Sequence, residues 1–565
     1  MHILPCIKSY YLNLGSKKTT SSTPMSPKIL RGVRITAALI FFLPLIFYFV
    51  DFAGIMPQSL AFALKLQFVP AILAGAWLYV AAVMILTLLF GRIYCSAICP
   101  FGVMMDCVSH ISGRGKKKNF KNKDKRYAYS RPHNVLRYSV LAIFTAAFFI
   151  SGLFLAVMLL DPYSNFGRIA ANIASPVYVA ANNALAYVTG LFGSHALYKV
   201  GFASFDIYAF SFSAAVLTVV ALLAFFKGRL YCNSVCPVGT FLGLFSRFSL
   251  FKIRIDQEKC TSCGICTMSC KSSCIEKGGK SIDYSRCVVC FDCIGGCKGH
   301  GITFSPGITG VKGTKHVTTG KNTPEDASRR EFLATSAAIA LSAPILSAAV
   351  PQPGKEKACA NAGECINGDT CDFTNQCYTS GSKLPVTPAG STGIEEFNAA
   401  CTACNLCIVK CPSQVLKPAV TEYGLRGFMQ PVMKYRDGHF CNYDCTVCSQ
   451  VCPTGAIKPL TKEEKHTVQI GIAHFFPGKC VAVVNSYDCG ACAEHCPTAA
   501  VHMKDNPSGG PRIPEVTPEL CVGCGACEQI CPEKAIIVYG NRVHRKAELP
   551  VKEDALEIDI DDFGF

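Results

Sequence analysis

The chain has 565 residues, half of them hydrophobic, and a positive mean hydropathy, which allows three or four domains and points to membrane spans. Thirty-five cysteines dominate the composition, and most fall in groups of four with gaps of two or three residues. This spacing suits metal clusters and argues against the disulfide scaffold of a secreted protein. The net charge of +17 does not indicate nucleic-acid binding, because the basic residues lie beside apolar segments.

Four apolar stretches are each long enough to cross the hydrocarbon core of a membrane, about 30 Å thick, as a helix. Basic residues precede the first stretch and separate the second from the third, which predicts cytoplasmic loops there under the positive-inside rule. The fourth stretch then returns to the cytoplasm at Lys227 and Arg229. The stretches are residues 33–52, 68–90, 136–160 and 207–226.

A twelve-residue sequence occurs at the predicted cytoplasmic ends of the second and fourth stretches. It begins at Gly91 and again at Gly228, and seven of the twelve positions are identical. Each copy contains a Cys-x-x-x-Cys-Pro motif, so two associated helix pairs would bring four thiols together, as internal repeats build sites in transporters. Four thiolates suffice for one iron-sulfur cluster, and the alternative is unligated thiols that pack the helix ends. The four residues are Cys95, Cys99, Cys232 and Cys236.

The segment after the fourth stretch contains eight cysteines in the pattern of a bacterial two-cluster ferredoxin. In that pattern the fourth cysteine of each set binds the cluster of the other set, so Cys297 is expected to complete the first 4Fe-4S cluster and Cys270 the second. Cys274 is extra, and we expect it to be a bystander. The two sets are Cys260, Cys263, Cys266 and Cys270, and Cys287, Cys290, Cys293 and Cys297.

A twin-arginine pattern begins at Ser328 and is followed by an uncharged stretch to Val350. It indicates an internal export signal or, alternatively, a fifth membrane helix, and both interpretations place the rest of the chain in the periplasm. Cleavage near Ala348 stays open. Four cysteines at six-residue intervals then predict two periplasmic disulfides, with a metal site as the alternative. They are Cys359, Cys365, Cys371 and Cys377.

Four further cysteine sets follow, and each ends in Cys-Pro. Their spacing favours 4Fe-4S clusters over zinc, because zinc sites typically use two separated cysteine pairs. Neighbouring sets could exchange their fourth cysteines, or the exchange could be nested, first with fourth and second with third. With the cytoplasmic pair, the sequence predicts six clusters. The sets are Cys401, Cys404, Cys407 and Cys411; Cys441, Cys445, Cys448 and Cys452; Cys480, Cys489, Cys492 and Cys496; and Cys521, Cys524, Cys527 and Cys531.

These motifs carry a resemblance to two kinds of protein. Residues 30–300, with the paired Cys-x-x-x-Cys-Pro motifs and the ferredoxin segment, resemble the NapH and NosR type of polyferredoxin membrane protein. Residues 328–545, with the twin-arginine pattern and four cysteine sets, resemble the NapG and MauM type of periplasmic ferredoxin. The chain thus looks like a fusion of the two. The resemblance implies a quinol dehydrogenase module that passes electrons to a periplasmic cytochrome or reductase.

We therefore predict a multi-domain membrane protein of the bacterial inner membrane, with an α-helical transmembrane domain of 4–5 helices and α+β ferredoxin-like 4Fe-4S domains. Its expected function is single-electron transfer from quinol or menaquinol. The alternatives are a redox maturation factor for a periplasmic metalloenzyme and a conduit from a cytoplasmic donor. No catalytic residue stands out, since Lys65, Asp106 and His110 fit the membrane interface.

The predicted parts follow one another along the chain. They are an N-terminal extension (1–29), a transmembrane domain (30–250), a cytoplasmic two-cluster ferredoxin domain (251–305), a linker with the twin-arginine pattern or fifth helix (306–350), a cysteine-containing periplasmic linker (351–395), a periplasmic four-cluster ferredoxin domain (396–545) and an acidic tail (546–565).

Overall fold

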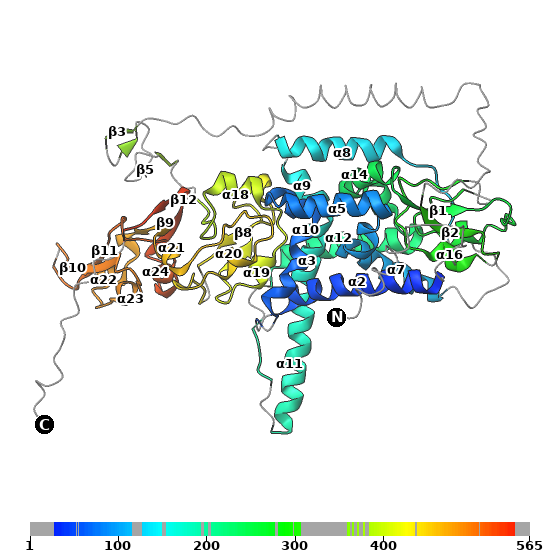
Figure 1. Cartoon of the computed structure of the whole chain (residues 1–565). Helices are drawn as coiled ribbons and strands as arrows, with labels where there is room; N and C mark the ends of the chain where they lie inside the picture. The colour runs from blue at the N-terminus through cyan, green and yellow to red at the C-terminus, as the bar shows by residue number, and fades with distance from the viewer. Residues whose placement is uncertain are drawn as a thin grey trace, which may run out of the picture.

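The computed structural model describes residues 27–548, with gaps at 52–53, 55, 116–126, 150–153, 194–196, 202–204, 277–280, 298, 307–358, 436–437 and 508 and short breaks between 362 and 383. The described residues form three parts in a row, with helices in the middle and smaller parts built of short strands and helices at both ends (Figure 1). The twin-arginine pattern, most of the N-terminal extension and nearly all of the acidic tail lie outside the described residues.

Two helices of the described part are long and apolar enough to cross a membrane, by length and composition alone. They are α2 (Pro27–Val50) and α12 (Ile207–Lys227). At 1.5 Å per residue, the 24 residues of α2 extend over about 36 Å. These helices coincide with the first and fourth apolar stretches of the sequence.

The second apolar stretch differs from the unbroken helix that the sequence predicts. The second divides into α4 (Phe68–Leu73) and α5 (Trp77–Phe90), because Gly75 adopts a left-handed conformation at φ +66° between them. The third includes α8 (Asn134–Phe149) and α9 (Phe154–Leu160). Hydropathy reports how apolar a stretch is and not whether it bends, so it gives no signal for the break at Gly75.

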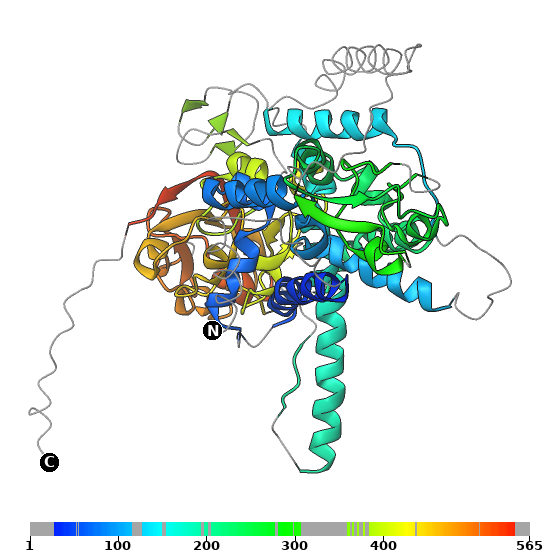
Figure 2. The same cartoon turned by 45° about the vertical axis from the view of Figure 1, so that its right-hand side comes forward.

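The remaining elements of the middle part are mostly short, except for two helices. Helix α11 projects away from the other helices in both views (Figures 1 and 2). The elements are η1 (Gln58–Ala61), α3 (Phe62–Lys65), α6 (Tyr94–Ala97), α7 (Pro100–Gly115), α10 (Pro162–Ile169), the π-helical turn η4 (Ala170–Ala174), α11 (Ser175–Leu191), α13 (Leu230–Ser234) and α14 (Pro237–Ser246).

The glycine that opens each repeat ends a long helix. Gly91 follows α5 at φ +73° and Gly228 follows α12 at φ +64°. A side chain would strain both positions, so glycine allows the chain to turn sharply into the short helices α6 and α13. The repeat is therefore a helix-end turn that presents its cysteines at one level of the helical part.

A small α+β part follows α14 and pairs the start and end of its own segment. Strand β1 (Phe251–Ile255) runs antiparallel to β2 (Ile302–Pro306), with Ile253 opposite Phe304. Two short helices lie between them, α15 (Ile265–Ser269) and α16 (Asp292–Gly296). Their buried apolar side chains form a core with Ile253 and Ile302.

The C-terminal part is built from three antiparallel strand pairs, β7 with β8, β9 with β12 and β10 with β11. Val386, Phe397, Ile408 and Val538 lie in its core. Its elements are α18 (Ile394–Ala400), α19 (Leu406–Val409), β7 (Leu416–Pro418), η6 (Gly424–Gly427), β8 (Pro431–Met433), α20 (Val447–Val451), α21 (Lys462–His466), β9 (Val468–Phe475), η7 (Pro477–Lys479), α22 (Val481–Val484), α23 (Ala491–Glu494), β10 (Val501–Lys504), β11 (Ile513–Val516), α24 (Ala526–Ile530) and β12 (Ile536–Lys546).

Candidate iron-sulfur sites

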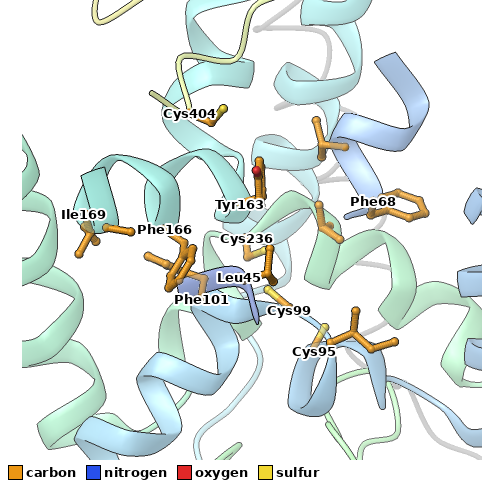
Figure 3. Packing of buried hydrophobic residues seen from close by; sticks show 14 of the residues in the cluster. Leu45, Phe68, Cys95, Cys99, Phe101, Tyr163, Phe166, Ile169, Cys236 and Cys404 are labelled. Carbon is orange, nitrogen blue, oxygen red and sulfur yellow. The ribbon is translucent and has the colours of Figure 1, made fainter. Parts of the chain in front are cut away.

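The two repeats bring their four cysteines together inside the helical part. Cys95, Cys99, Cys232 and Cys236 are all buried, and they pack in one cluster with aromatic side chains. Cys99 lies close enough to Cys95 and Cys232, and Cys236 close enough to the other three, for their charges to act on each other. Figure 3 shows Cys95, Cys99 and Cys236 converging from their separate elements. We name these four residues the membrane quartet, after the membrane placement that the sequence predicts.

Each repeat supplies a buried arginine that binds the backbone of the other repeat. Arg92 Nη2 donates to the Cys232 carbonyl over 3.0 Å, and Arg229 Nη1 donates to the Cys95 carbonyl over 2.6 Å. Both arginine side chains are fully buried. A Cβ atom on Gly102 would lie 2.2 Å from the Cys95 carbonyl oxygen, and one on Gly239 would lie 2.4 Å from that of Cys232, so both positions require glycine. The crossed bonds fix the two repeats against each other around the quartet.

Asp106 connects the two repeats to the small α+β part. Its carboxylate accepts from Arg229 Nε at 2.9 Å and lies 2.8 Å from Arg34 Nη1 and 3.7 Å from Lys271 Nζ. Lys271 also pairs with Asp292 at 3.0 Å. Burial raises the pKa of Asp106, but the three cations outweigh burial and hold it well below its usual value. The sequence suggested a membrane-interface residue, whereas the structure buries Asp106 in an ion-pair network.

The eight cysteines of the small α+β part surround two cavities. Cys260, Cys263, Cys266 and Cys297 line one of them. Cys270, Cys287, Cys290 and Cys293 line the other. The fourth cysteine of each set thus lies with the first three of the other set, the grouping expected for a two-cluster ferredoxin.

Cys274, which the sequence marked as extra, also lines the second cavity. It is almost fully buried, and its Sγ lies 3.4 Å from the Sγ of Cys270. Hydrogen bonding to Cys274 is the largest cause that lowers the pKa of Cys270, to about 7. Five thiols therefore share this cavity, and the motif spacing gave no signal for the fifth.

The C-terminal sets group by exchange between neighbours. After burial, Cys452 is the strongest influence that raises the pKa of Cys401, which places Cys452 beside the first set. Cys411 likewise raises the pKa of Cys441 and Cys448 and lies with the second set.

The third and fourth sets repeat the exchange around two cavities. Their lining residues include Cys480, Cys489, Cys492 and Cys531 in one cavity and Cys496, Cys521, Cys524 and Cys527 in the other. Of the two arrangements that the sequence left open, the structure has the neighbour exchange and not the nested one.

The donor sets fit an iron-sulfur cluster better than a single ion. Within the described residues, no group of three His, Cys, Asp or Glu side chains is close enough to hold one metal ion. The groups nevertheless consist of four or five converging, mostly buried thiols, and thiolates are the ligands of iron-sulfur clusters. A cluster of several metal ions could be bound by all the thiols of such a set.

One tyrosine lies between the membrane quartet and the first C-terminal set. Figure 3 shows Tyr163 between Cys236 and Cys404. Tyr163 belongs to α10, whose N-terminus is capped by Asp161 through bonds to the backbone nitrogens of Tyr163 and Ser164. Gly167, on the same helix, allows the Cys404 backbone to approach, since a Cβ there would lie 2.5 Å from the Cys404 carbonyl oxygen. Helix α10 therefore joins the two groups.

Helix α2 contacts both end parts. Near its start, Arg31 pairs with Asp292 of the α+β part at 3.3 Å. After its end, Asp51 accepts from Lys410 of the C-terminal part at 2.8 Å, and the Lys410 ammonium lies 4.8 Å from the ring centre of Tyr48. The end parts therefore dock at opposite ends of a helix long enough to span a membrane.

Four cysteines of one small sheet and the single residue Cys107 belong to none of these sites. Strands β3 (Cys359–Asn361), β4 (Glu364–Cys365), β5 (Thr370–Cys371) and β6 (Cys377–Tyr378) form a sheet in which Cys359 is paired in register with Cys365, and Cys371 with Cys377. The predicted disulfides of this segment stay a prediction. Cys107 is exposed on α7.

Sequence reasoning gave no role in the site to Arg92, Arg229, Asp106 or Tyr163. The two arginines did carry a signal, because each follows the first glycine of a repeat. Asp106 and Tyr163 each occur once, outside any repeat or motif, so no pattern in a single sequence marked them.

Comparison with known families finds iron-sulfur domains in both halves of the chain. The 4Fe-4S binding domain family matches residues 73–119 and 208–256, which contain the membrane quartet. The 4Fe-4S dicluster domain family matches residues 487–535, which contain most of the third and fourth C-terminal sets. The protein thus has 4Fe-4S binding domains.

The chain is similar to proteins of ferredoxin-type electron transport. YccM of Escherichia coli, whose name assigns it provisionally to electron transport, is 22% identical over 43% of this chain and 59% of its own length. The methylamine utilization ferredoxin-type protein MauM of Methylophilus methylotrophus is 33% identical over 15% of this chain and 37% of its own. The regulatory protein NosR of Stutzerimonas stutzeri is 31% identical over 14% of this chain and 11% of its own. No solved structure matches significantly.

Proposed function

We propose that the protein oxidises quinol in a bacterial inner membrane and passes the electrons singly to a periplasmic cytochrome or reductase. One observation carries the proposal, namely that the cysteine groups follow one another along the molecule. Figure 1 shows α16 at one end, α10 and α12 in the middle, then α19 and α20, and finally α22 to α24. Each of these regions holds or adjoins cysteine groups.

The residues that would hold six clusters are those of the two cytoplasmic and four C-terminal groups, and the membrane quartet would hold a seventh. Bound 4Fe-4S clusters supply one-electron transfer. Arg92 and Arg229 hold the quartet in place and provide positive charge beside its thiolates. Aromatic side chains around it exclude water.

The membrane placement is part of the proposal. It is supported by α2 and α12, by the docking of the end parts at opposite ends of α2, and by the many exposed apolar side chains of these helices, such as Leu39, Phe47 and Leu222. The C-terminal part would lie in the periplasm. The fusion of a NapH-type with a NapG-type protein explains how both parts come to be in one chain.

The ion-pair network that joins the α+β part to the two repeats favours a second candidate. Through Lys271, Asp106 and Arg229 that part is coupled to the helix ends, so a cytoplasmic donor could feed the same path. Under this alternative the electrons still move toward the C-terminal part, and quinol is not their source.

The test uses the full-length protein, purified without oxygen and loaded with clusters. Iron per chain should be about 28 for seven clusters, against about 24 for six. A reduced menaquinol analogue should reduce the clusters, followed by electron paramagnetic resonance. Failure of quinol to reduce them, with reduction by a low-potential cytoplasmic-type donor, would favour the second candidate.

A matched pair of variants tests the quartet itself. The double variant Cys95→Ser, Cys232→Ser should lose about four irons per chain and block electron passage to the C-terminal clusters. Cys107→Ser, on the exposed side of α7, should keep both. Unchanged iron in the double variant would show that the quartet holds no cluster.

A further inference from the structure

A polar and aromatic cavity of about 260 Å³ lies where the helical part meets the α+β part. Three segments form it: residues 127–133 before α8, the end of α12 with the start of α13, and the loop after Cys270 together with Arg286. Its basic side chains are Arg131, His133, Lys227 and Arg286, and among the described residues that line it none is acidic.

Two residues that line this cavity each carry a buried donor with no hydrogen-bond acceptor within the described structure. The donors are Arg286 Nη2 and Ser272 Oγ, on side chains that are about 3% and 5% exposed. The rest of the Arg286 side chain is held in place, because Nε donates to Asp283 over 2.6 Å and Nη1 to the Ser130 carbonyl over 2.8 Å. A buried donor without a partner is costly, so the pair is suited to a ligand that brings an acceptor oxygen.

The cavity adjoins two cysteine groups at once. Ser272 also lines the cavity of Cys270, Cys287, Cys290 and Cys293. On the other side Asn233, next to Cys232, accepts from Arg92 and donates to the Ser272 carbonyl. A ligand in this position would therefore have the membrane quartet on one side and a cytoplasmic group on the other.

The ligand should have a flat ring and an apolar tail. The aromatic residues Tyr127, Tyr129 and Phe226 line the wall, and the Arg286 guanidinium lies over the ring of Tyr129, 5.5 Å from its centre. Phe226 is 61% exposed at the end of the apolar helix α12, so one side of the cavity borders the surface that would face lipid. Buried donors for a carbonyl oxygen, aromatic walls and an apolar border match a membrane quinone better than a small anion.

We propose that this cavity binds the headgroup of a membrane quinone, with Arg286 and Ser272 donating to a ring oxygen. The inference rests on the proposed electron-transfer function and gives it a substrate site. Oxidation of the hydroquinone breaks its two O–H bonds and yields the quinone, two electrons and two protons. The electrons leave one at a time through the two adjoining cysteine groups. The exposed His133 takes up a proton and returns it to water, and the second proton follows the same way.

The test is photolabelling of the cluster-loaded, full-length protein with an azido-naphthoquinone, with the labelled peptides identified by mass spectrometry. Label is expected within residues 127–133, 226–234 or 272–286, and unlabelled menaquinone should displace it. Ser272→Ala should weaken binding about tenfold, because it removes one buried hydrogen bond and nothing else that the side chain makes. Arg286→Lys, which keeps the charge but loses Nη2, should weaken it at least as much.

Ser246→Ala is the matched control, because Ser246 is equally buried in the same region, bonds to the Tyr284 carbonyl and lies outside the cavity. It should leave labelling unchanged, and all variants should retain iron. Label at another place, with quinol still reducing the clusters, would overturn this site and leave the proposed function standing. Neither labelling nor reduction would overturn both. Displacement by inorganic phosphate but not by menaquinone would show an anion site instead.

Discussion

Among single residues, Asp106 pairs with the largest number of buried cations described above. It neutralises Arg34 and Arg229 in the interior, and removing one partner of a buried ion pair leaves an uncompensated charge. Asp106→Asn should therefore lower the free energy of unfolding by about 3–5 kcal/mol, measured by denaturant titration of the detergent-solubilised protein. Asp256→Asn is the control, since Asp256 forms a more exposed pair with Lys259 at 3.7 Å and should change stability by less than about 1 kcal/mol.

The same carboxylate sets a pH dependence. Because its folded-state pKa is depressed, the stability that Asp106 contributes is complete above the unfolded value of about 4 and is lost as the pH falls toward the folded value. At neutral pH the network is therefore at full strength. Equal losses for Asp106→Asn and Asp256→Asn at pH 7 would contradict this account.

The contribution of His544 to stability should change at a higher pH than that of Asp106. It lies on β12, its Nε2 is 2.7 Å from Thr387 Oγ1, and burial lowers its pKa to about 4. The unfolded chain binds a proton near pH 6.5 and the folded chain only near pH 4, so stability falls as the pH drops through this window. The loss should be on the order of 3 kcal/mol. The free energy of unfolding of His544→Gln, measured against pH, should not show this loss. A wild-type free energy of unfolding that is constant between pH 6.5 and 4 would refute the burial argument.

The sequence was informative about residues wherever a motif repeats. The cysteine sets follow from their spacing, because ligand spacing is set by local chain geometry, and the convergence of the membrane quartet was expected from the repeat. Asp106, Tyr163 and Cys274 depend on which segments meet in three dimensions, and a single sequence carries no record of those meetings. Cys274 shows this most clearly, since the motif spacing says nothing about its neighbours and the fold places it among four other thiols.

At the scale of elements, short helices distribute the thiols between neighbouring groups. In the C-terminal part α19 lies between Cys404 and Cys411 and α20 precedes Cys452, so each set sends its last cysteine across to the other. Cys452→Ser should therefore perturb the same electron paramagnetic resonance signal as Cys404→Ser. Cys411→Ser should instead match Cys445→Ser. If Cys452→Ser matched Cys445→Ser, the exchange would be wrong.

Elements were less predictable than motifs. Hydropathy located α2 and α12, but it treated α4 and α5 as one continuous helix. The break between these two helices depends on the backbone of Gly75, and glycine is also common inside unbroken membrane helices. Hydropathy therefore predicted that the second stretch is apolar, but not where its helices begin and end.

At the scale of the whole molecule, the proposal places the two end parts on opposite sides of a membrane. An epitope inserted after Gly279 should resist protease in intact spheroplasts and be digested after lysis. An epitope at the C-terminus of the full chain should be digested in both cases. Equal protection of the two epitopes would show that both parts lie on one side, and the docking at the two ends of α2 would then need another explanation.

Because the two arginines bind across the repeats, the assembly of the membrane quartet should not depend on the concentration of the protein. A polypeptide with one repeat would hold two of the four cysteines and an arginine without its carbonyl acceptor, and it would need a second molecule to complete the set. Such a site would form only as far as mass action allowed the two molecules to meet. With both repeats in one chain the halves are always present at equal number and within reach, so the site should be complete even when the membrane holds few copies.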